Sequence, residues 1–246
     1  MIRALLIVIL VVAFLILSIP ILIVEWIIGK FNPYARDISS LRIVQFMFKL
    51  ILFVAGTKVT VIGEDRIPKD MPVLYVGNHR SYFDIVLTYA RCPNLTGYVA
   101  KDSMKKIPLL SIWMERLHCL FLNRSDIKEG LKTILKGIDQ MKSGISMCIF
   151  PEGTRSESED ETQLLPFKEG SLKMAEKTGY PIVPMSINNT RNIFEAHMPF
   201  IRSAHVILEY GEPIYPKDLP KEQKKFLGAH CQEIIQNTVS KNQSLV

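Results

Sequence analysis

Residues 73–84 read Val-Leu-Tyr-Val-Gly-Asn-His-Arg-Ser-Tyr-Phe-Asp, and this stretch decides the fold class. The apolar run at 73–76 predicts a buried β-strand, because Val, Leu and Tyr suit pleated, buried backbone. The polar residues His79 and Asp84 follow that strand directly. Polar residues at the end of a buried strand are typical of α/β proteins, whose binding crevices lie at the carboxyl ends of strands.

Outward from this strand, short β-rich runs alternate with helical stretches from Lys58 onward. Strands are expected at 58–62, 73–76, 96–100, 119–122, 145–150, 182–187 and 205–209, and helices at 126–142, 171–178 and 221–239. The clearest helix, 126–142, follows a candidate cap at Ser125 or Asp126. This alternation predicts an α/β fold with a mixed, largely parallel sheet flanked by helices.

The amino-terminal residues 4–28 form an apolar segment, and 4–24 carry no charge. A run of roughly 20 apolar residues is long enough to cross the hydrocarbon core of a bilayer. The run is too long for a signal peptide, so we expect an uncleaved membrane anchor. Pro20 leaves a kinked or re-entrant hairpin open. Glu25 and Trp26 are expected at the membrane–water interface.

The next stretch, 41–55, mixes basic with apolar and aromatic residues. Two interpretations stay open: the segment lies in the headgroup plane, or it packs on the core of the protein. More basic residues follow the apolar run than precede it, which places the main domain on the cytoplasmic face. We therefore divide the chain into a membrane anchor with an interfacial helical segment at 1–56 and a main domain at 57–246.

The composition restricts the class of partner. The 246 residues include 48% hydrophobic residues and carry a net charge of +6. The apolar share indicates contact with lipid, and the positive charge suits anionic lipids or phosphorylated substrates. Nucleic acid is excluded as a partner, because the sequence has no basic block and no nucleic-acid-binding motif. The four cysteines form no Cys-x-x-Cys pair, which indicates free thiols in a reducing compartment.

His79 and Asp84 are candidates for a catalytic pair. On one regular helix their spacing corresponds to about 140° of rotation, so their side chains would point apart. They meet if His79 lies in the turn and Asp84 in the first turns of the following helix. Asp84 then accepts a hydrogen bond from one imidazole nitrogen and leaves the other as a base. On spacing alone, a helix-capping residue beside a structural histidine is the alternative.

Two further polar segments end expected strands. Phe-Pro-Glu-Gly-Thr-Arg-Ser at 150–156 offers close backbone approach at Gly153 and donors for phosphate at Thr154 and Arg155. Phe-Leu-Asn-Arg at 121–124 places Arg124 at the end of another strand. The carboxyl ends of parallel strands share one edge of a sheet, so we expect these segments to meet His79 there.

In this order, these blocks resemble those of the 1-acyl-sn-glycerol-3-phosphate (lysophosphatidic acid) acyltransferase family. The shared blocks are Asn-His-x-x-x-x-Asp, Phe-x-x-Arg, Phe-Pro-Glu-Gly-Thr-Arg-Ser and the Pro-Ile-Val-Pro run at 181–184. The resemblance implies that His79 is the general base and that Asp84 orients it. It also implies a set of substrate-binding residues, namely Lys101, Arg124, Glu152, Gly153, Thr154 and Arg155. The acidic loop at 156–161 departs from the family pattern, which more often has neutral or basic residues there.

The resemblance implies direct acyl transfer from a thioester to the sn-2 hydroxyl of lysophosphatidic acid, which gives phosphatidic acid in phospholipid synthesis. The expected partners are the lysophospholipid, membrane lipid and an acyl thioester of CoA or acyl carrier protein. No cofactor is implied, and no metal, because the histidines lack ligand spacing. Two alternatives stay open: the same chemistry on glycerol-3-phosphate or a lyso-aminolipid, and a catalytically silent membrane adaptor.

Overall fold

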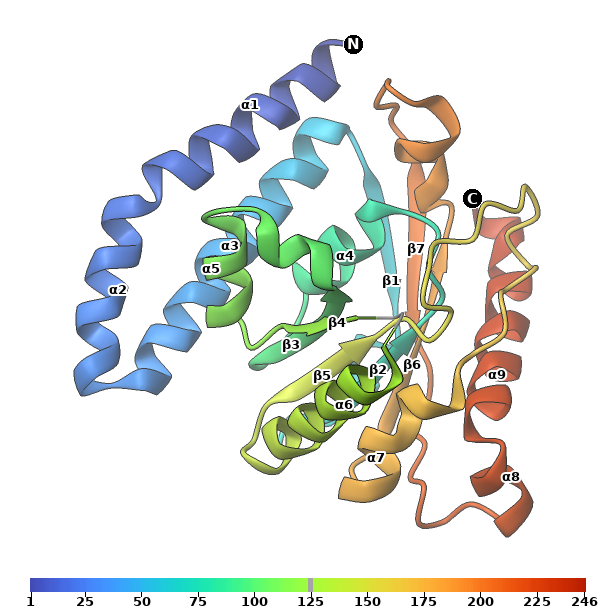
Figure 1. The fold of residues 1–246 in the computed structure, drawn as a ribbon. Helices are drawn as coiled ribbons and strands as arrows, with labels where there is room; N and C mark the ends of the chain where they lie inside the picture. The colour runs from blue at the N-terminus through green and yellow to red at the C-terminus, as the bar shows by residue number, and fades with distance from the viewer. Residues whose placement is uncertain (124–125) are drawn as a thin grey trace.

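A seven-stranded sheet forms the centre of the computed structural model, which describes residues 1–123 and 126–246 (Figure 1). The strand order is β1-β7-β6-β2-β5-β3-β4. Neighbouring strands are parallel except for β6 and β7, which are antiparallel. The mixed, largely parallel sheet expected from the sequence is therefore confirmed. The strands are β1 (Lys58–Ile62), β2 (Leu74–Gly77), β3 (Thr96–Lys101), β4 (Leu120–Leu122), β5 (Ser146–Ile149), β6 (Ile182–Asn188) and β7 (His205–Tyr210).

Helices cover both faces of the sheet, and each face has its own apolar core. Alternate residues of β2 show the division, because successive strand side chains point to opposite faces. Tyr75 joins the core that includes α3 (Pro33–Ala55), α4 (Tyr82–Tyr89) and α5 (Leu110–Arg116). Leu74 and Val76 join the core that includes α6 (Ile127–Lys142), α7 (Lys173–Thr178) and α9 (Leu227–Asn242).

The ends of the expected helices follow local chemistry. Asp126 caps α6, because its Oδ1 accepts hydrogen bonds from the backbone N–H groups of Lys128 and Glu129; Ser125, the other candidate cap, lies outside the described residues. The helix expected at 171–178 begins as a 3₁₀ turn, η3 (Glu169–Leu172), before α7. The one expected at 221–239 is interrupted at Phe226, which has φ −119°, and this break separates α8 (Lys221–Lys225) from α9.

The apolar amino-terminal segment is two helices rather than one straight span. They are α1 (Ile2–Leu17) and α2 (Ile19–Phe31), with a bend of 46° between them. Pro20 lies in the first turn of α2, where the missing N–H of proline costs no helical hydrogen bond. Among the described residues, α3 alone is long and apolar enough to cross a membrane, and α1 with α2 meets the same criteria as a bent pair.

Polar and aromatic contacts attach α1 and α2 to the rest of the fold. The Phe14 and Trp113 rings lie 5.3 Å apart, and Trp113 Nε1 donates to Ser18 Oγ at 3.0 Å. The Glu25 carboxylate is 2% exposed and accepts hydrogen bonds from Ser40 and Arg116. The Glu25 carboxylate therefore faces α3 and α5, and its position relative to the membrane–water interface stays a prediction. The other side of both helices is exposed and apolar.

The helix α3 packs on the core, as one of the two interpretations of the segment at 41–55 expected, and contact of its outer side with lipid headgroups stays a prediction. One side contributes Leu41, Val44 and Ile51 to the core. The opposite side exposes basic and aromatic residues at helical spacing, namely Arg42, Phe46, Lys49 and Phe53. The helix begins at Pro33 behind the cap Asn32 and ends at Gly56, whose φ of 71° suits the left-handed position after a helix.

Candidate active site

The segments with the expected site residues meet at one edge of the sheet. The strands β2 and β5 are parallel neighbours, so the turns that follow them, with His79 and Glu152, leave the sheet side by side. The strand β6 lies on the other side of β2. Asn78 joins these ends, since its side chain donates to the carbonyl of Ile187 at 2.8 Å and accepts from the N–H of Ile187 at 2.9 Å.

Asp84 orients His79 and caps α4 at the same time. Its Oδ2 lies 2.8 Å from His79 Nδ1 and accepts the backbone N–H groups of Arg80 and Ser81, each at 2.7 Å. Ser81 and Asp84 form a capping box, which fixes where α4 begins. His79 thus lies in the turn and Asp84 in the first turn of the helix, as the spacing required. Asp84 thus both caps α4 and contacts His79, and the catalytic role of the pair stays a prediction.

The His79 imidazole is held on two sides. Its ring stacks on Phe150 with a centroid separation of 4.4 Å and an interplanar angle of 18°. The contact with the Asp84 carboxylate requires a proton on Nδ1, because an ionised carboxylate only accepts. This tautomer leaves the Nε2 lone pair free to accept a proton. The side chain of His79 is 13% exposed and that of Asp84 is 1% exposed.

Glu152 supports the backbone around His79. One carboxylate oxygen accepts the N–H of His79 at 2.6 Å and the other accepts the N–H of Leu165 at 2.9 Å. Ser156 N–H returns a hydrogen bond to the carbonyl of His79 at 2.8 Å. Burial raises the pKa of Glu152 against the lowering effect of the two N–H donors. Both oxygens already have backbone partners, and contact with substrate stays a prediction for this residue.

Arg155 occupies a position where it could bind an anion. Its guanidinium lies over the Tyr82 ring at 3.7 Å and forms an ion pair with Glu195, with 3.1 Å between Nη1 and Oε1. Glu195 also accepts the Ser81 hydroxyl at 2.6 Å and the Tyr82 N–H at 2.8 Å. The pair with Glu195 uses Nη1, so the edge with Nε and Nη2 faces a different direction. That edge has the fork geometry that binds phosphate through two parallel hydrogen bonds.

The remaining expected residues differ in how the structure places them. Gly153 has a φ of +75°, and an added Cβ would lie 2.6 Å from Lys168 Nζ, so this turn favours glycine. Thr154 is exposed beside it. Lys101 ends β3, is exposed, and pairs in register with Leu122 of β4. Arg124 lies outside the described residues, so its role stays a prediction from the sequence.

Sequence reasoning did not identify three residues that contact the site. Arg80 is 5% exposed, its guanidinium donates to the carbonyl of Ser158, and burial lowers its pKa. Thr190 donates its hydroxyl to Asp84 Oδ1. Glu195 holds Arg155. The strand-end rule could have indicated Thr190, which follows β6 closely, whereas Glu195 lies in an irregular 3₁₀ segment, η5 (Glu195–His197), without a recognisable pattern.

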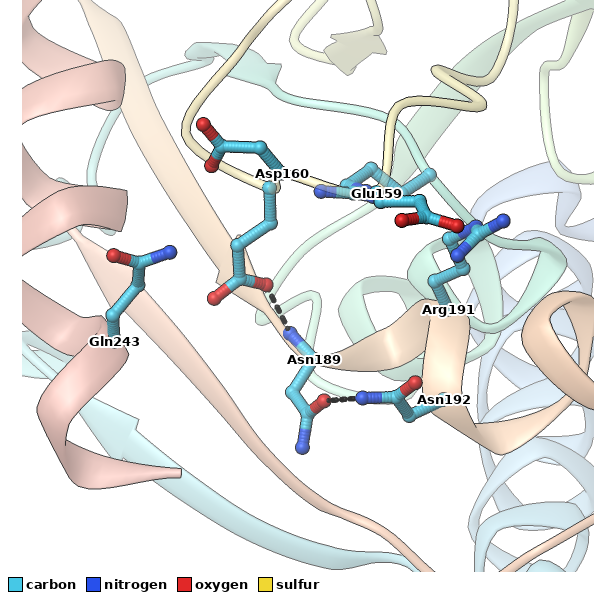
Figure 2. Close-up of a pocket in the computed structure, with 8 residues that line it drawn as sticks. Glu159, Asp160, Asn189, Arg191, Asn192 and Gln243 are labelled. Atoms are coloured by element: carbon cyan, nitrogen blue, oxygen red, sulfur yellow. Dashed lines mark hydrogen bonds between the residues drawn. The ribbon is translucent and has the colours of Figure 1, made fainter.

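A polar hollow lies beside these residues, between the acidic loop and the segment after β6 (Figure 2). Its lining includes Glu159 and Asp160 of the acidic loop, Asn189 and Arg191 of the segment after β6, and Arg80. Among the residues that the structure describes, no cluster of three or more His, Cys, Asp or Glu side chains could hold a metal ion. The expectation that the reaction needs no cofactor stays a prediction.

Comparison with known proteins shows the family to which this chain belongs. A family model described as Acyltransferase matches residues 58–188, more than half of the chain, and the chain therefore belongs to this family. The 1-acyl-sn-glycerol-3-phosphate acyltransferase of Borreliella burgdorferi is 39% identical over 155 residues, which cover 62% of this chain and 60% of that protein. The enzyme of the same name from Saccharomyces cerevisiae is 32% identical over 198 residues, which cover 80% of this chain and 63% of that protein.

These comparisons confirm the family resemblance drawn from the motifs. The chain spans less than two thirds of the length of both relatives. The crystal structure of the 1-acyl-sn-glycerophosphate acyltransferase PlsC from Thermotoga maritima has the same fold, with a TM-score of 0.82 and 23% sequence identity. That likeness covers 98% of this chain and 96% of the Thermotoga chain, so it includes the amino-terminal helices.

Proposed function

We propose that this chain is a 1-acylglycerol-3-phosphate acyltransferase, which moves a fatty acyl group from a thioester to the sn-2 hydroxyl of lysophosphatidic acid. The observation that carries the proposal is the 2.8 Å contact between His79 Nδ1 and Asp84 Oδ2 at the carboxyl edge of the sheet. Relatives named for this reaction support the choice of acceptor. The product is phosphatidic acid.

The proposed chemistry is direct transfer with His79 as the general base. Nε2 takes the proton of the acceptor hydroxyl while the hydroxyl oxygen attacks the thioester carbonyl. The tetrahedral intermediate then expels the thiolate as the carbon–sulfur bond breaks, and the imidazolium returns the proton to sulfur. Asp84 keeps Nδ1 protonated and stabilises the imidazolium. The reaction needs no covalent acyl-enzyme.

We assign the acceptor's phosphate to Arg155. The Nε and Nη2 edge of its guanidinium has no hydrogen-bond partner among the described residues and matches two phosphate oxygens, while Glu195 and Tyr82 hold the other parts of the side chain. Gly153 and Thr154 would form the backbone next to the phosphate. Lys101 would add positive charge at the end of β3, and Arg124 is proposed from the sequence to add a further charge. The acyl donor is a thioester of CoA or of acyl carrier protein, used as a co-substrate without a further cofactor.

The amino-terminal helices are proposed to dock this site on the membrane. The exposed apolar side of α1 and α2 would enter the lipid while the opposite side stays on the domain. The basic residues after the apolar run favour the cytoplasmic face. Protease treatment of sealed vesicles tests this topology, because the exposed acidic loop at 156–161 should be cut from the cytoplasmic side alone.

An assay with purified full-length protein tests the proposed reaction. The acceptors are lysophosphatidic acid, lysophosphatidylethanolamine and glycerol-3-phosphate, each offered with acyl-CoA and with acyl carrier protein thioester. We expect the highest kcat/KM on lysophosphatidic acid. A preference for another acceptor would move the assignment to that lipid. A lack of turnover with every pair would instead support a silent membrane adaptor.

A further inference from the structure

Thr190 contributes a fourth hydrogen bond to the Asp84 carboxylate. Its Oγ1 donates to Oδ1 of Asp84, whereas His79 Nδ1 lies 2.8 Å from the other oxygen, Oδ2. Thr190 is 2% exposed and Asp84 is fully buried. The carboxylate therefore lies between the threonine hydroxyl and the imidazole, with a different oxygen facing each of them.

This arrangement lets Thr190 control where Oδ2 points. A carboxylate turns about its bond to the β-carbon, and that torsion is soft. A hydrogen bond to Oδ1 restricts the turn, so it also fixes Oδ2 against His79. The backbone N–H groups of Arg80 and Ser81 both donate to Oδ2, so neither of them restrains Oδ1. Without the hydroxyl, Oδ1 would be a buried acceptor with no replacement from bulk water, which is an unfavourable state for a carboxylate.

The acidic loop fixes the turn that carries Thr190. Both oxygens of Glu161 accept hydrogen bonds from this turn, one from Asn189 N–H at 2.9 Å and one from Asn188 Nδ2 at 2.8 Å. Figure 2 shows that Asn189 is hydrogen-bonded both to the acidic loop and to Asn192. Asn189 has a φ of 67°, a left-handed conformation that asparagine tolerates better than most residues.

We propose that Thr190 is a positioning residue of the acyl-transfer reaction, which acts by fixing the Asp84 carboxylate against His79, and that Glu161 holds the turn on which Thr190 lies. The inference rests on the proposed role of His79 as the base. It also gives the acidic segment, which departs from the family pattern, a function inside the protein. Within the loop this function belongs to Glu161, whereas Glu157, Glu159 and Asp160 are exposed.

Substitution of Thr190 tests the proposal. Thr190→Val keeps the shape and removes the donor, and Thr190→Ser keeps the donor. We expect Thr190→Val to lower kcat by roughly tenfold to a hundredfold with both KM values within about twofold of wild type. Thr190→Ser should restore most of the turnover. Wild-type kcat in a folded Thr190→Val protein would overturn the proposal.

Thr88 provides a matched control one helical turn from Asp84. Its hydroxyl is as deeply buried, at 1% exposure, but it donates to the backbone carbonyl of Asp84 at 2.7 Å and does not touch the carboxylate. Thr88→Val should therefore keep kcat close to wild type even if it lowers the melting temperature. Equal losses of kcat in both valine variants would show a general effect of a buried hydroxyl and would contradict positioning by Thr190.

A double-mutant cycle separates action through Asp84 from an independent role. In an Asp84→Asn background, Thr190→Val should cost little further turnover, because the carboxylate is already lost. Additive losses would overturn the proposal. If Thr190→Val does not fold, Glu161→Gln takes its place, with a lower kcat and an unchanged KM expected and an unchanged kcat contradicting the inference. Wild-type turnover in His79→Ala would instead reject the proposed function itself.

Discussion

The guanidinium of Arg155 is held by the carboxylate of Glu195, with 3.1 Å between Nη1 and Oε1. The two residues come from different parts of the chain, since Arg155 follows β5 and Glu195 lies between β6 and β7. Glu195 also accepts from Ser81 and Tyr82 at the start of α4. One carboxylate thus joins the proposed phosphate-binding residue to the helix that carries Asp84.

Replacement of Arg155 by lysine should weaken acceptor binding. A lysine keeps the charge but lacks the planar fork that matches phosphate oxygens, and it cannot use one edge for Glu195 and another for substrate. We expect the KM for lysophosphatidic acid to rise by about tenfold and the KM for the acyl donor to stay near wild type. Steady-state kinetics with each substrate varied in turn measures both values.

Arg91→Lys is the matched control for that experiment. Arg91 forms a two-bond pair with Glu64 beyond the other end of α4, at 2.8 and 2.7 Å. The control loses the same fork geometry outside the site, and it should leave both KM values unchanged. An unchanged KM for the acceptor in Arg155→Lys would count against the phosphate assignment.

Replacement of Glu152 by glutamine should lower turnover, because an amide oxygen can accept only one of the two backbone N–H bonds that the carboxylate receives.

The raised pKa of Glu152 should also make the free energy of unfolding depend on pH. The folded state holds this proton more tightly than the unfolded chain, so the free energy of unfolding falls as pH rises from about 4.5 through the raised pKa. Denaturant unfolding between pH 4 and pH 7 measures this slope, which should be smaller in Glu152→Gln. Equal slopes in the two proteins would show that Glu152 titrates alike when folded and unfolded.

Deletion of residues 1–31 should damage the domain as well as its membrane binding. Removal of α1 and α2 uncovers Trp113, which is 2% exposed, and leaves Arg116 without Glu25. We expect lower activity on both membrane-embedded and short-chain, water-soluble acceptors, together with a lower melting temperature. A truncated protein with full activity on the soluble acceptor would show that the two helices are a separable anchor.

Substitutions on the outer side of α1 separate membrane binding from folding. Leu5, Ile9, Val12 and Ile16 are all at least half exposed and follow helical spacing. Replacement of Ile9 and Val12 by aspartate should reduce vesicle binding and activity on embedded acceptor, with activity on the soluble acceptor retained. Unchanged vesicle sedimentation would exclude this surface as the membrane contact.

Much of the sheet and the His79–Asp84 pair followed from local sequence. Each expected strand overlaps an observed one, because the buried strands are continuous apolar runs between polar turns. The pair was predictable because both residues belong to one turn and the helix after it. Its environment was harder to predict: Thr190 follows β6 but is distant in sequence from Asp84, and Glu195 lies in an irregular segment that carries no periodic pattern.

The amino-terminal helices show the same limit. Their apolar composition was evident, but the sequence did not show which side would pack on the domain. Glu25 lies in an apolar run near its end, and its burial depends on Arg116, which lies far along the chain. Contacts between segments distant in sequence decide such positions, and no local pattern encodes them.

Turnover of His79→Ala beside His118→Ala tests the central claim most directly. His118 is a second histidine paired with an aspartate, with 2.9 Å between Nε2 and Asp37 Oδ2, but it lies outside the site. With lysophosphatidic acid in vesicles and acyl-CoA as donor, we predict that His79→Ala loses about 10²–10⁴-fold in kcat while His118→Ala stays near wild type. A folded His79→Ala protein that kept more than about a tenth of wild-type turnover would contradict His79 as the base.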